Sequence, residues 1–190
     1  MTHRGPVVVA MSGGVDSSVA AALLKEAGYE VIGVMLRLWA ECGSHANRCC
    51  APEAVAAARQ VAAQLDIPFY VRDYRDAFRR AVVDYFLADY ASGRTPSPCV
   101  VCNERIRFGL LLDEALGLGA THLATGHYAR INRNASGEWQ LLRGVDPVKD
   151  QSYVLHRLTQ AHLARVLFPL GSHTKREVRA MAAQRGLAVS

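Results

Sequence analysis

The sequence predicts an α/β domain in which a parallel β-sheet has helices on both faces. Short apolar segments rich in β-branched residues alternate with longer segments whose apolar residues have helical spacing, and this alternation is typical of βαβ units. Of the 190 residues, 51% are hydrophobic, which is enough for one domain with a sizeable buried core. Crossover connections between parallel strands distribute the helices over both faces of the sheet.

Strands and helices are expected to alternate through the first two thirds of the chain. Each expected strand is a short apolar run, as a buried parallel strand requires. These strands are Val7–Met11, Glu30–Leu36, Ile67–Val71 and Thr121–Thr125. The expected helices are Ser17–Ala27, Pro52–Leu65, Arg75–Tyr90 and Val100–Leu116. Gly28 follows the first of these helices, Pro52 opens the second, and prolines 96 and 98 exclude regular structure over Gly93–Pro98.

The last third of the chain has weaker patterns. A hairpin is expected around the turn Asn134–Gly137, with strands at Ile131–Asn132 and Trp139–Leu142. Three helices are expected, at Gln151–Leu158, Ala161–Leu167 and Thr174–Arg185. The last of them begins with the capping-box pattern Thr174-x-x-Glu177. Because ligands bind at the carboxyl ends of parallel strands, chemistry is expected in the segments that follow the strands.

Composition favours a cytoplasmic protein with reduced thiols and no membrane association. No apolar run approaches the ~18 residues that a membrane span needs, and Val7–Met11 is too short for the core of a signal peptide. Five cysteines without a secretory signal favour catalytic or metal-binding thiols over a disulfide framework. The 22 Lys and Arg against 17 Asp and Glu give a net charge of +5, which permits an anionic partner such as a nucleotide or nucleic acid.

The segment Ser12–Ser18, S-G-G-V-D-S-S, joins a buried strand to a helix start. Its glycines let backbone N–H groups approach an anion, and the helix dipole favours phosphate there. The serine hydroxyls add donors, whereas Asp16 beside phosphate suggests a Mg²⁺ bridge. The segment lacks the Lys of a P-loop and the spacing of a dinucleotide-binding fingerprint. The alternative interpretation is an N-cap turn whose glycines serve packing alone.

A second segment, Gly93–Asn103, reads G-R-T-P-S-P-C-V-V-C-N and leads from an extended loop to a helix start. A helix N-terminus with arginines nearby favours a thiolate at Cys99 or Cys102. Such a thiolate suits a nucleophile, a persulfide carrier or a metal ligand. The Cys-x-x-Cys spacing leaves a redox pair, half a zinc site and two ligands of an iron–sulfur cluster open. Two buried structural thiols are the alternative.

Together these two motifs and Gly144–Tyr153, G-V-D-P-V-K-D-Q-S-Y, resemble the tRNA-specific 2-thiouridylase family of the ATP-pyrophosphatase (PP-loop) superfamily. The segments Thr125–Arg130 and Leu167–Gly171 also fit the family, and the resemblance runs from Val7 to about Leu187. It implies a PP-loop domain of the adenine nucleotide alpha-hydrolase type, which is Rossmann-like. The loop alone leaves open other members of the superfamily, among them the argininosuccinate, GMP, NAD and asparagine synthetases.

The resemblance implies roles for individual residues. Cys102 stands where the family has its nucleophilic cysteine, and Asp16 belongs to the catalytic loop. ATP contacts fall on Ala10, Met11, Ser12, Gly13, Gly14, Val15, Asp16, Ser17, Met35 and Gly126. Contacts with the target base fall on Ser97, Pro98 and Cys99, and contacts with tRNA on Lys149, Asp150 and Gln151. Many members have Asn and Asp at positions 97 and 99, so the base contacts of Ser97 and Cys99 depart from the family pattern.

The reaction that the resemblance implies uses ATP and Mg²⁺ to adenylate the C2 oxygen of the wobble uridine (U34) of tRNA, after which sulfur replaces the adenylated oxygen. A cysteine desulfurase or a sulfur-relay protein would supply the sulfur. Some relatives are associated with a [4Fe-4S] cluster, which makes Cys99 and Cys102 candidate cluster ligands. The second catalytic cysteine of the family is absent, since no cysteine follows Cys102 in this chain.

The chain is therefore expected to be the N-terminal catalytic domain, residues 1–190, of a longer protein. Its final helix is expected to begin the linker to a central domain, which would precede a C-terminal β-barrel. The chain alone is expected to be inactive in thiolation. Two alternatives remain: another PP-loop ligase or amidotransferase acting on a small molecule, and a non-catalytic ATP-binding fragment.

Three weaker features of the sequence can each be explained by a purely structural role. Cys42, His45, Cys49 and Cys50 cluster in a polar stretch that is expected to be a loop of thiols rather than a metal site, because their spacing matches no common zinc ribbon. His127, beside Gly126, is expected to contact a ligand or to serve the structure. The aromatic residues of Phe78–Tyr90 are expected in the core rather than as a platform for stacking bases.

Overall fold

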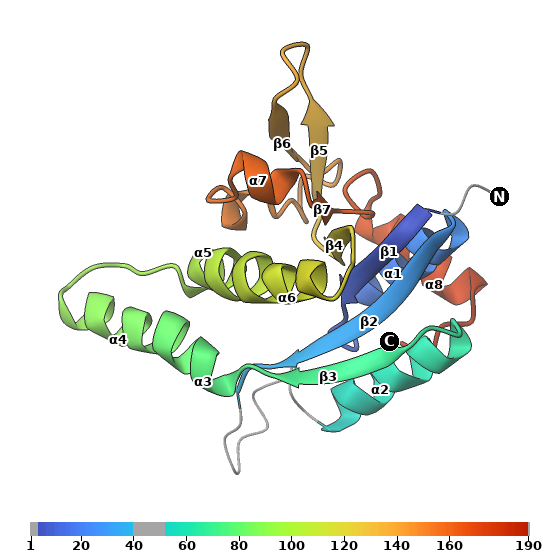
Figure 1. The fold of residues 1–190 in the computed structure, drawn as a ribbon, viewed down its shortest axis with the longest axis horizontal. Helices are drawn as coiled ribbons and strands as arrows, with labels where there is room; N and C mark the ends of the chain where they lie inside the picture. The colour runs from blue at the N-terminus through green and yellow to red at the C-terminus, as the bar shows by residue number, and fades with distance from the viewer. Residues whose placement is uncertain (1–3, 40–51, 190) are drawn as a thin grey trace.

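A computed structural model describes residues 4–39 and 52–189, and its centre is a five-stranded parallel sheet (Figure 1). The strand order is β3-β2-β1-β4-β7. The strands are β1 (Arg4–Ala10), β2 (Tyr29–Arg37), β3 (Phe69–Asp73), β4 (His122–Thr125) and β7 (Val166–Leu167). The predicted class, a parallel sheet with helices on both faces, is confirmed, since buried β-branched runs alternate with helices through most of the chain.

Residues along β1 alternate between two hydrophobic cores, one on each face of the sheet. Val7 and Val9 pack into the first core, and Val8 into the second. The helices α1 (Val15–Glu26), α2 (Pro52–Gln64) and α8 (Lys175–Gln184) cover the first face. Helix α8 contributes Val178 and Ala182 to that core, and the predicted capping box between Thr174 and Glu177 begins it.

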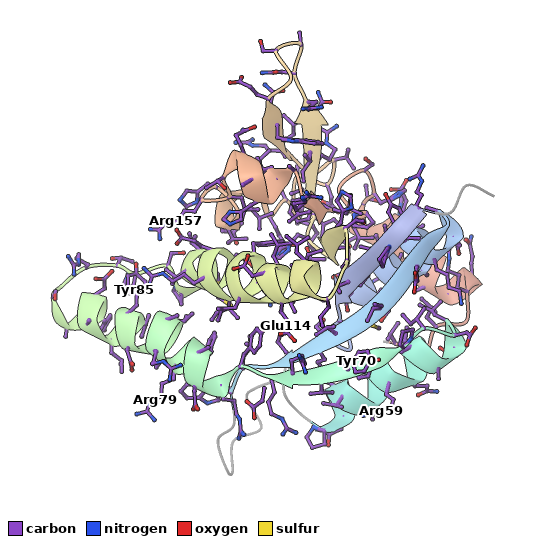
Figure 2. All side chains as sticks on the ribbon, in the orientation of Figure 1. Arg59, Tyr70, Arg79, Tyr85, Glu114 and Arg157 are labelled. Carbon is purple, nitrogen blue, oxygen red and sulfur yellow. The ribbon has the colours of Figure 1, made fainter. Side chains whose placement is uncertain are left out.

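The second face is covered by two long helices, each of which changes geometry in the middle. The first comprises α3 (Arg75–Phe78), the π-helical η1 (Arg79–Val83) and α4 (Asp84–Ala91). The second comprises α5 (Pro98–Val101), the π-helical η2 (Cys102–Leu111) and α6 (Leu112–Gly117). Both were predicted as plain helices, and the wider turns within them are new findings. Glu114 on α6, which is labelled in Figure 2, accepts hydrogen bonds from Arg72 on β3 and from Tyr74, the residue after β3.

The aromatic stripe of the first long helix is only partly in the core. Phe78 and Tyr85 pack against the second core, as predicted. Helix α4 has no buried residue, and its Tyr90 is 71% exposed although it stacks on Phe86. The expectation that the whole stripe is core is therefore wrong for Tyr90, because the end of α4 extends beyond the sheet (Figure 1).

The last third departs from the sequence prediction in two places. The predicted helix Ala161–Leu167 is the short α7 (Gln160–Leu163) followed by strand β7, which is the edge strand beside β4. The predicted helix Gln151–Leu158 contains only the single 3₁₀ turn η3 (Ser152–Val154). The predicted hairpin is confirmed as β5 (Ala129–Arg133) and β6 (Trp139–Arg143), a separate antiparallel pair. Of the helices in the described part of the chain, none has the length and apolar character to span a membrane.

Candidate functional site

A polar cavity of about 230 Å³ lies at the carboxyl ends of β1 and β4. These neighbouring strands are the point where the strand order reverses, because β2 lies on one side of β1 and β4 on the other. Parallel α/β sheets bind ligands at such a position. The lining residues come from the loop after β1, the segment after β4, the π-helix η2 and the 144–151 segment: Ala10, Ser12, Asp16, Ser17, Arg107, Thr125, Gly126, His127 and Gln151.

The loop after β1 is held in a compact turn by its own hydroxyl groups. The backbone N–H of Ser12 donates to the hydroxyl of Ser17 over 3.1 Å, and that hydroxyl lies 3.2 Å from the carbonyl oxygen of Gly14, to which it donates. Ser18 is fully buried and donates its hydroxyl to the same carbonyl, so it supports the helix start rather than facing the cavity. The loop therefore offers Ser12 and the N-terminus of α1 to an anion.

Gly13 is required for this turn. Its φ is +76°, and a Cβ placed there would lie 2.3 Å from the carbonyl oxygen of Ala54 on α2. A side chain at position 13 is thus excluded both by backbone conformation and by contact with α2. The glycine lets the loop pass beside α2 on its way to the helix that carries Asp16.

Asp16 is the acidic centre of the site. Its two carboxylate oxygens each accept a hydrogen bond of 2.7 Å from the ammonium of Lys175, the first residue of α8. The hydroxyl of Tyr128, which is 3% exposed, donates to Asp16 Oδ1 over 2.7 Å. Burial and the hydrogen bond to Asp16 raise the pKa of Tyr128, so its hydroxyl stays protonated as a donor.

Two residues after β4 complete the cavity wall opposite the loop. Gly126 lies so close to α1 that a Cβ there would be 2.9 Å from the carbonyl carbon of Asp16 and from the nitrogen of Ser17. His127 Nδ1 lies 2.7 Å from the hydroxyl of Thr125. Burial, with a smaller effect of the Arg107 guanidinium, lowers the pKa of His127 to about 3. The imidazole is therefore neutral, and Arg107 is the cation on this side of the cavity.

The helix that carries Cys102 also supplies Arg107 to the cavity. Arg107 donates to the side-chain oxygen of Asn103 over 2.9 Å, and the Asn103 amide donates to the carbonyl of Val154 over 3.3 Å. Cys102 is 8% exposed and belongs to the second core, whereas Cys99 is exposed one turn earlier. Cys102, the predicted nucleophile, and Arg107, which lines the cavity, are thus on the same π-helical segment, and such segments are frequent at functional sites.

Ser97 is the residue before α5, and Pro98 and Cys99 are its first two residues. They stand at the end of the proline-rich loop. Of the predicted tRNA contacts, Lys149 is exposed, whereas Asp150 and Gln151 also hold the structure together. Asp150 accepts from the backbone of Gly144 over 2.9 Å, and Gln151 bonds the backbone of Tyr128. These base and tRNA contacts stay predictions.

The structure brings together only part of the predicted ATP set. Ala10, Ser12, Asp16, Ser17 and Gly126 line the cavity. Met11 and Met35 are 3% and 1% exposed and lie in the first core at the ends of β1 and β2. The sequence interpretation missed Arg107, Tyr128 and Lys175 as members of this site. A signal for Lys175 was its place directly after the capping Thr174, at the start of a helix.

No three His, Cys, Asp or Glu side chains are grouped as a metal site over residues 4–39 and 52–189. Cys42, His45, Cys49 and Cys50 lie outside the described residues, so the expectation for them is not tested. The cluster ligation by Cys99 and Cys102 likewise stays a prediction.

Comparison with known proteins gives one family for the sequence. Residues 5–190 match the family described as the tRNA methyl transferase HUP domain. The chain is 55% identical over 193 aligned residues to the tRNA-specific 2-thiouridylase MnmA of Geotalea uraniireducens, an alignment that covers 98% of this chain and 52% of the relative. It is 59% identical to the protein of that name from Chloroflexus aurantiacus, over 95% of this chain and 51% of the relative. The chain thus spans about half the length of the curated relatives it matches.

Solved structures share the fold at lower identity. A predicted tRNA methyltransferase subunit from Methanocaldococcus jannaschii superposes with a TM-score of 0.58 at 20% identity, covering 95% of this chain and 75% of the other. The NH3-dependent NAD synthetase of Campylobacter jejuni gives a TM-score of 0.55 at 20% identity, covering 96% of this chain and 65% of the other.

Proposed function

From its match over residues 5–190 this chain belongs to the tRNA methyl transferase HUP domain family, and on that premise we propose that it carries the ATP-dependent step of tRNA uridine 2-thiolation. One observation carries the proposal: the S-G-G-V-D-S-S loop, Gly126 and the helix of Cys102 meet around one polar cavity at the reversal of strand order. The relatives named as tRNA-specific 2-thiouridylases support the choice of reaction.

The residues at the cavity fit a nucleotide with Mg²⁺. Glycines without side chains, the Ser12 hydroxyl and the start of α1 provide donors for phosphates, and Arg107 provides a cation. The carboxylate of Asp16 is of the type that binds Mg²⁺, which would neutralise charge on the phosphates when bound. Residues 10–17, Met35 and Gly126 are the proposed ATP contacts. Lys175, which donates to both oxygens of Asp16, fixes that carboxylate beside the cavity.

The proposed reaction has two balanced steps. The C2 oxygen of U34 attacks the α-phosphorus of ATP, the bond to the β-phosphate breaks, and pyrophosphate leaves. The outer sulfur of a persulfide on a carrier cysteine then attacks C2, and the C2–O bond breaks with AMP as the leaving group. To complete this step, the thiolate of Cys102 attacks the inner sulfur of the carrier and the S–S bond breaks. The outer sulfur stays on C2, and the disulfide between Cys102 and the carrier is left for a thiol reductant. Donors fixed around the cavity stabilise the charge that develops on the phosphates. Arg107, five residues after Cys102, joins the nucleotide side of the site to the thiol side.

Cys102 is the proposed thiol of the second step. The target base is proposed to contact Ser97, Pro98 and Cys99. The rest of the tRNA is proposed to contact Lys149, Asp150 and Gln151. A cysteine desulfurase or a sulfur-relay protein is the proposed donor, and the cytoplasm, where thiols stay reduced, is the proposed location. The family's second catalytic cysteine is not among these 190 residues. The proposal therefore assigns adenylation to this chain and complete thiolation to a full-length protein.

Pyrophosphate release tests the proposal. Purified chain is incubated with Mg·ATP and a tRNA that has uridine at position 34, and with the same tRNA carrying guanosine there. Release is expected with the first tRNA only. Release without tRNA, or equally with both, would favour a ligase acting on a small molecule, and ATP binding without release would favour a non-catalytic fragment. Iron and sulfide analysis after anaerobic purification of a full-length 2-thiouridylase carrying this domain decides between a cluster and a persulfide carrier.

A further inference from the structure

The 144–151 segment is hydrogen-bonded to the carboxylate of Asp16 by two separate routes. In the first route, Asp146 Oδ2 accepts the backbone N–H of Lys175 over 2.9 Å, and the ammonium of the same Lys175 donates to both oxygens of Asp16 at 2.7 Å. In the second route, the backbone N–H of Gln151 donates to the carbonyl oxygen of Tyr128 over 2.9 Å, and the backbone N–H of Tyr128 donates to the side-chain oxygen of Gln151 over 3.1 Å. The Tyr128 hydroxyl in turn donates to Asp16 over 2.7 Å. The two ends of the 144–151 segment are thus both connected to Asp16, one through Lys175 and the other through Tyr128.

The two routes are short, and the second passes through the buried side chain of Tyr128. Asp146 also accepts the backbone N–H groups of Val148 and Lys149 over 3.0 and 3.2 Å, so the position of its carboxylate is fixed by the turn it closes. The hydrogen bond from the backbone of Lys175, with those of this turn, lowers the pKa of Asp146, which keeps the carboxylate charged. Tyr128 is 3% exposed. A displacement of the exposed Lys149 therefore reaches Asp16 through few intervening groups.

We propose that the 144–151 segment couples RNA binding to nucleotide binding, with Asp146 and Tyr128 as positioning residues that act through Asp16. The inference rests on the proposed function, because it takes Lys149 as an RNA contact and Asp16 as part of the nucleotide site. RNA phosphate on Lys149 stabilises the arrangement described above, in which the segment holds Lys175 and Tyr128 on Asp16. Because coupling is reciprocal, ATP strengthens RNA binding by the same factor by which RNA strengthens ATP binding.

The test is the ratio of affinities for Mg²⁺ with α,β-methylene-ATP, an ATP analogue that cannot release pyrophosphate, with and without a saturating tRNA that has U34, measured by calorimetry on the full chain. For the wild type we expect a ratio of at least about fivefold, the low end of common coupling strengths. In Asp146→Asn and Tyr128→Phe the ratio is expected to fall to within about twofold of unity. Using a ratio separates coupling from any change in the affinity for ATP alone.

Matched controls are Asp113→Asn on α6 and Tyr70→Phe on β3, two exposed positions away from the cavity, which are expected to keep the wild-type ratio. Tyr128→Phe keeps the buried ring, so it remains informative if Asp146→Asn fails to fold, which thermal unfolding will show. Wild-type protein that binds both ligands with a ratio of one, or variants that keep the wild-type ratio, would overturn the coupling and leave the proposed function intact. A wild-type chain that binds no Mg·ATP would overturn the proposed function and this inference with it.

Discussion

Gly126→Ala tests whether the close contact between the end of β4 and the start of α1 forms the nucleotide site. An added Cβ would lie 2.9 Å from the carbonyl carbon of Asp16 and the nitrogen of Ser17, and 3.1 Å from the Asp16 Cβ. Two of these atoms are backbone, so neither can rotate away. The helix start and the segment after β4 must separate by several tenths of an ångström.

The structure sets the expected magnitudes. Overpacking of a tight contact costs about 1–3 kcal/mol of unfolding free energy. For a domain of this size, that lowers Tm by roughly 2–12 °C. The same displacement moves the start of α1 away from the phosphates. Loss of one hydrogen bond to a charged group, worth about 1.5–3 kcal/mol, lowers Mg·ATP affinity by about 10- to 150-fold.

The assay combines thermal unfolding with calorimetric titration of Mg·ATP. Gly117→Ala is the matched control, because a Cβ at the end of α6 meets nothing within 4 Å. This control is expected to keep the wild-type Tm within about 2 °C and the wild-type affinity for ATP. If Gly126→Ala is as stable as this control and binds Mg·ATP equally well, the placement of the nucleotide between β4 and α1 is refuted.

Three further predictions concern single groups. Asp16→Ala is expected to lower Mg·ATP turnover by at least about 100-fold, roughly 2.7 kcal/mol in the barrier, and unaltered turnover would count against the assigned loop. Cys102→Ser in a full-length 2-thiouridylase carrying this domain is expected to abolish tRNA thiolation, measured by nucleoside analysis, while pyrophosphate release continues; loss of both would mean that Cys102 serves folding. For His127, whose pKa falls from 6.5 to about 3 on folding, the unfolded state binds more protons between these values. Stability is therefore full above pH 6.5 and falls on acidification, by up to about 2 kcal/mol at pH 5. His127→Gln removes this loss, and equal acid sensitivity of variant and wild type in urea titrations at pH 7 and 5 would show that the histidine is not buried in its neutral form.

Much of the fold was predictable because most of its strands and helices are marked by patterns of neighbouring residues in the sequence. Val7–Met11 is apolar throughout, as a strand buried on both faces must be, and Thr174 with Glu177 marked a helix start that the structure confirms. Strand β7 was missed because Val166 and Leu167 are too few to show a period. The exposure of Tyr90 was missed for another reason: helical spacing of apolar residues predicts a helix face but not whether another element lies against it.

The difference between local patterns and contacts between distant elements also explains which part of the site was predictable. The loop at residues 12–18 is contiguous in sequence, so the pattern of glycines and hydroxyls that predicts phosphate binding can be recognised from the sequence alone. Tyr128 and Lys175 are 112 and 159 residues from Asp16. The pairing of β4 with β1 brings Tyr128 to it, and the packing of α8 in the same core as α1 brings Lys175. Sequence alone assigned Asp16 to a metal, whereas the structure shows its carboxylate bound to an ammonium and a phenol. These two partners fix the position of the Asp16 carboxylate, so the affinity for Mg·ATP is expected to depend on residues that are far from Asp16 in the sequence.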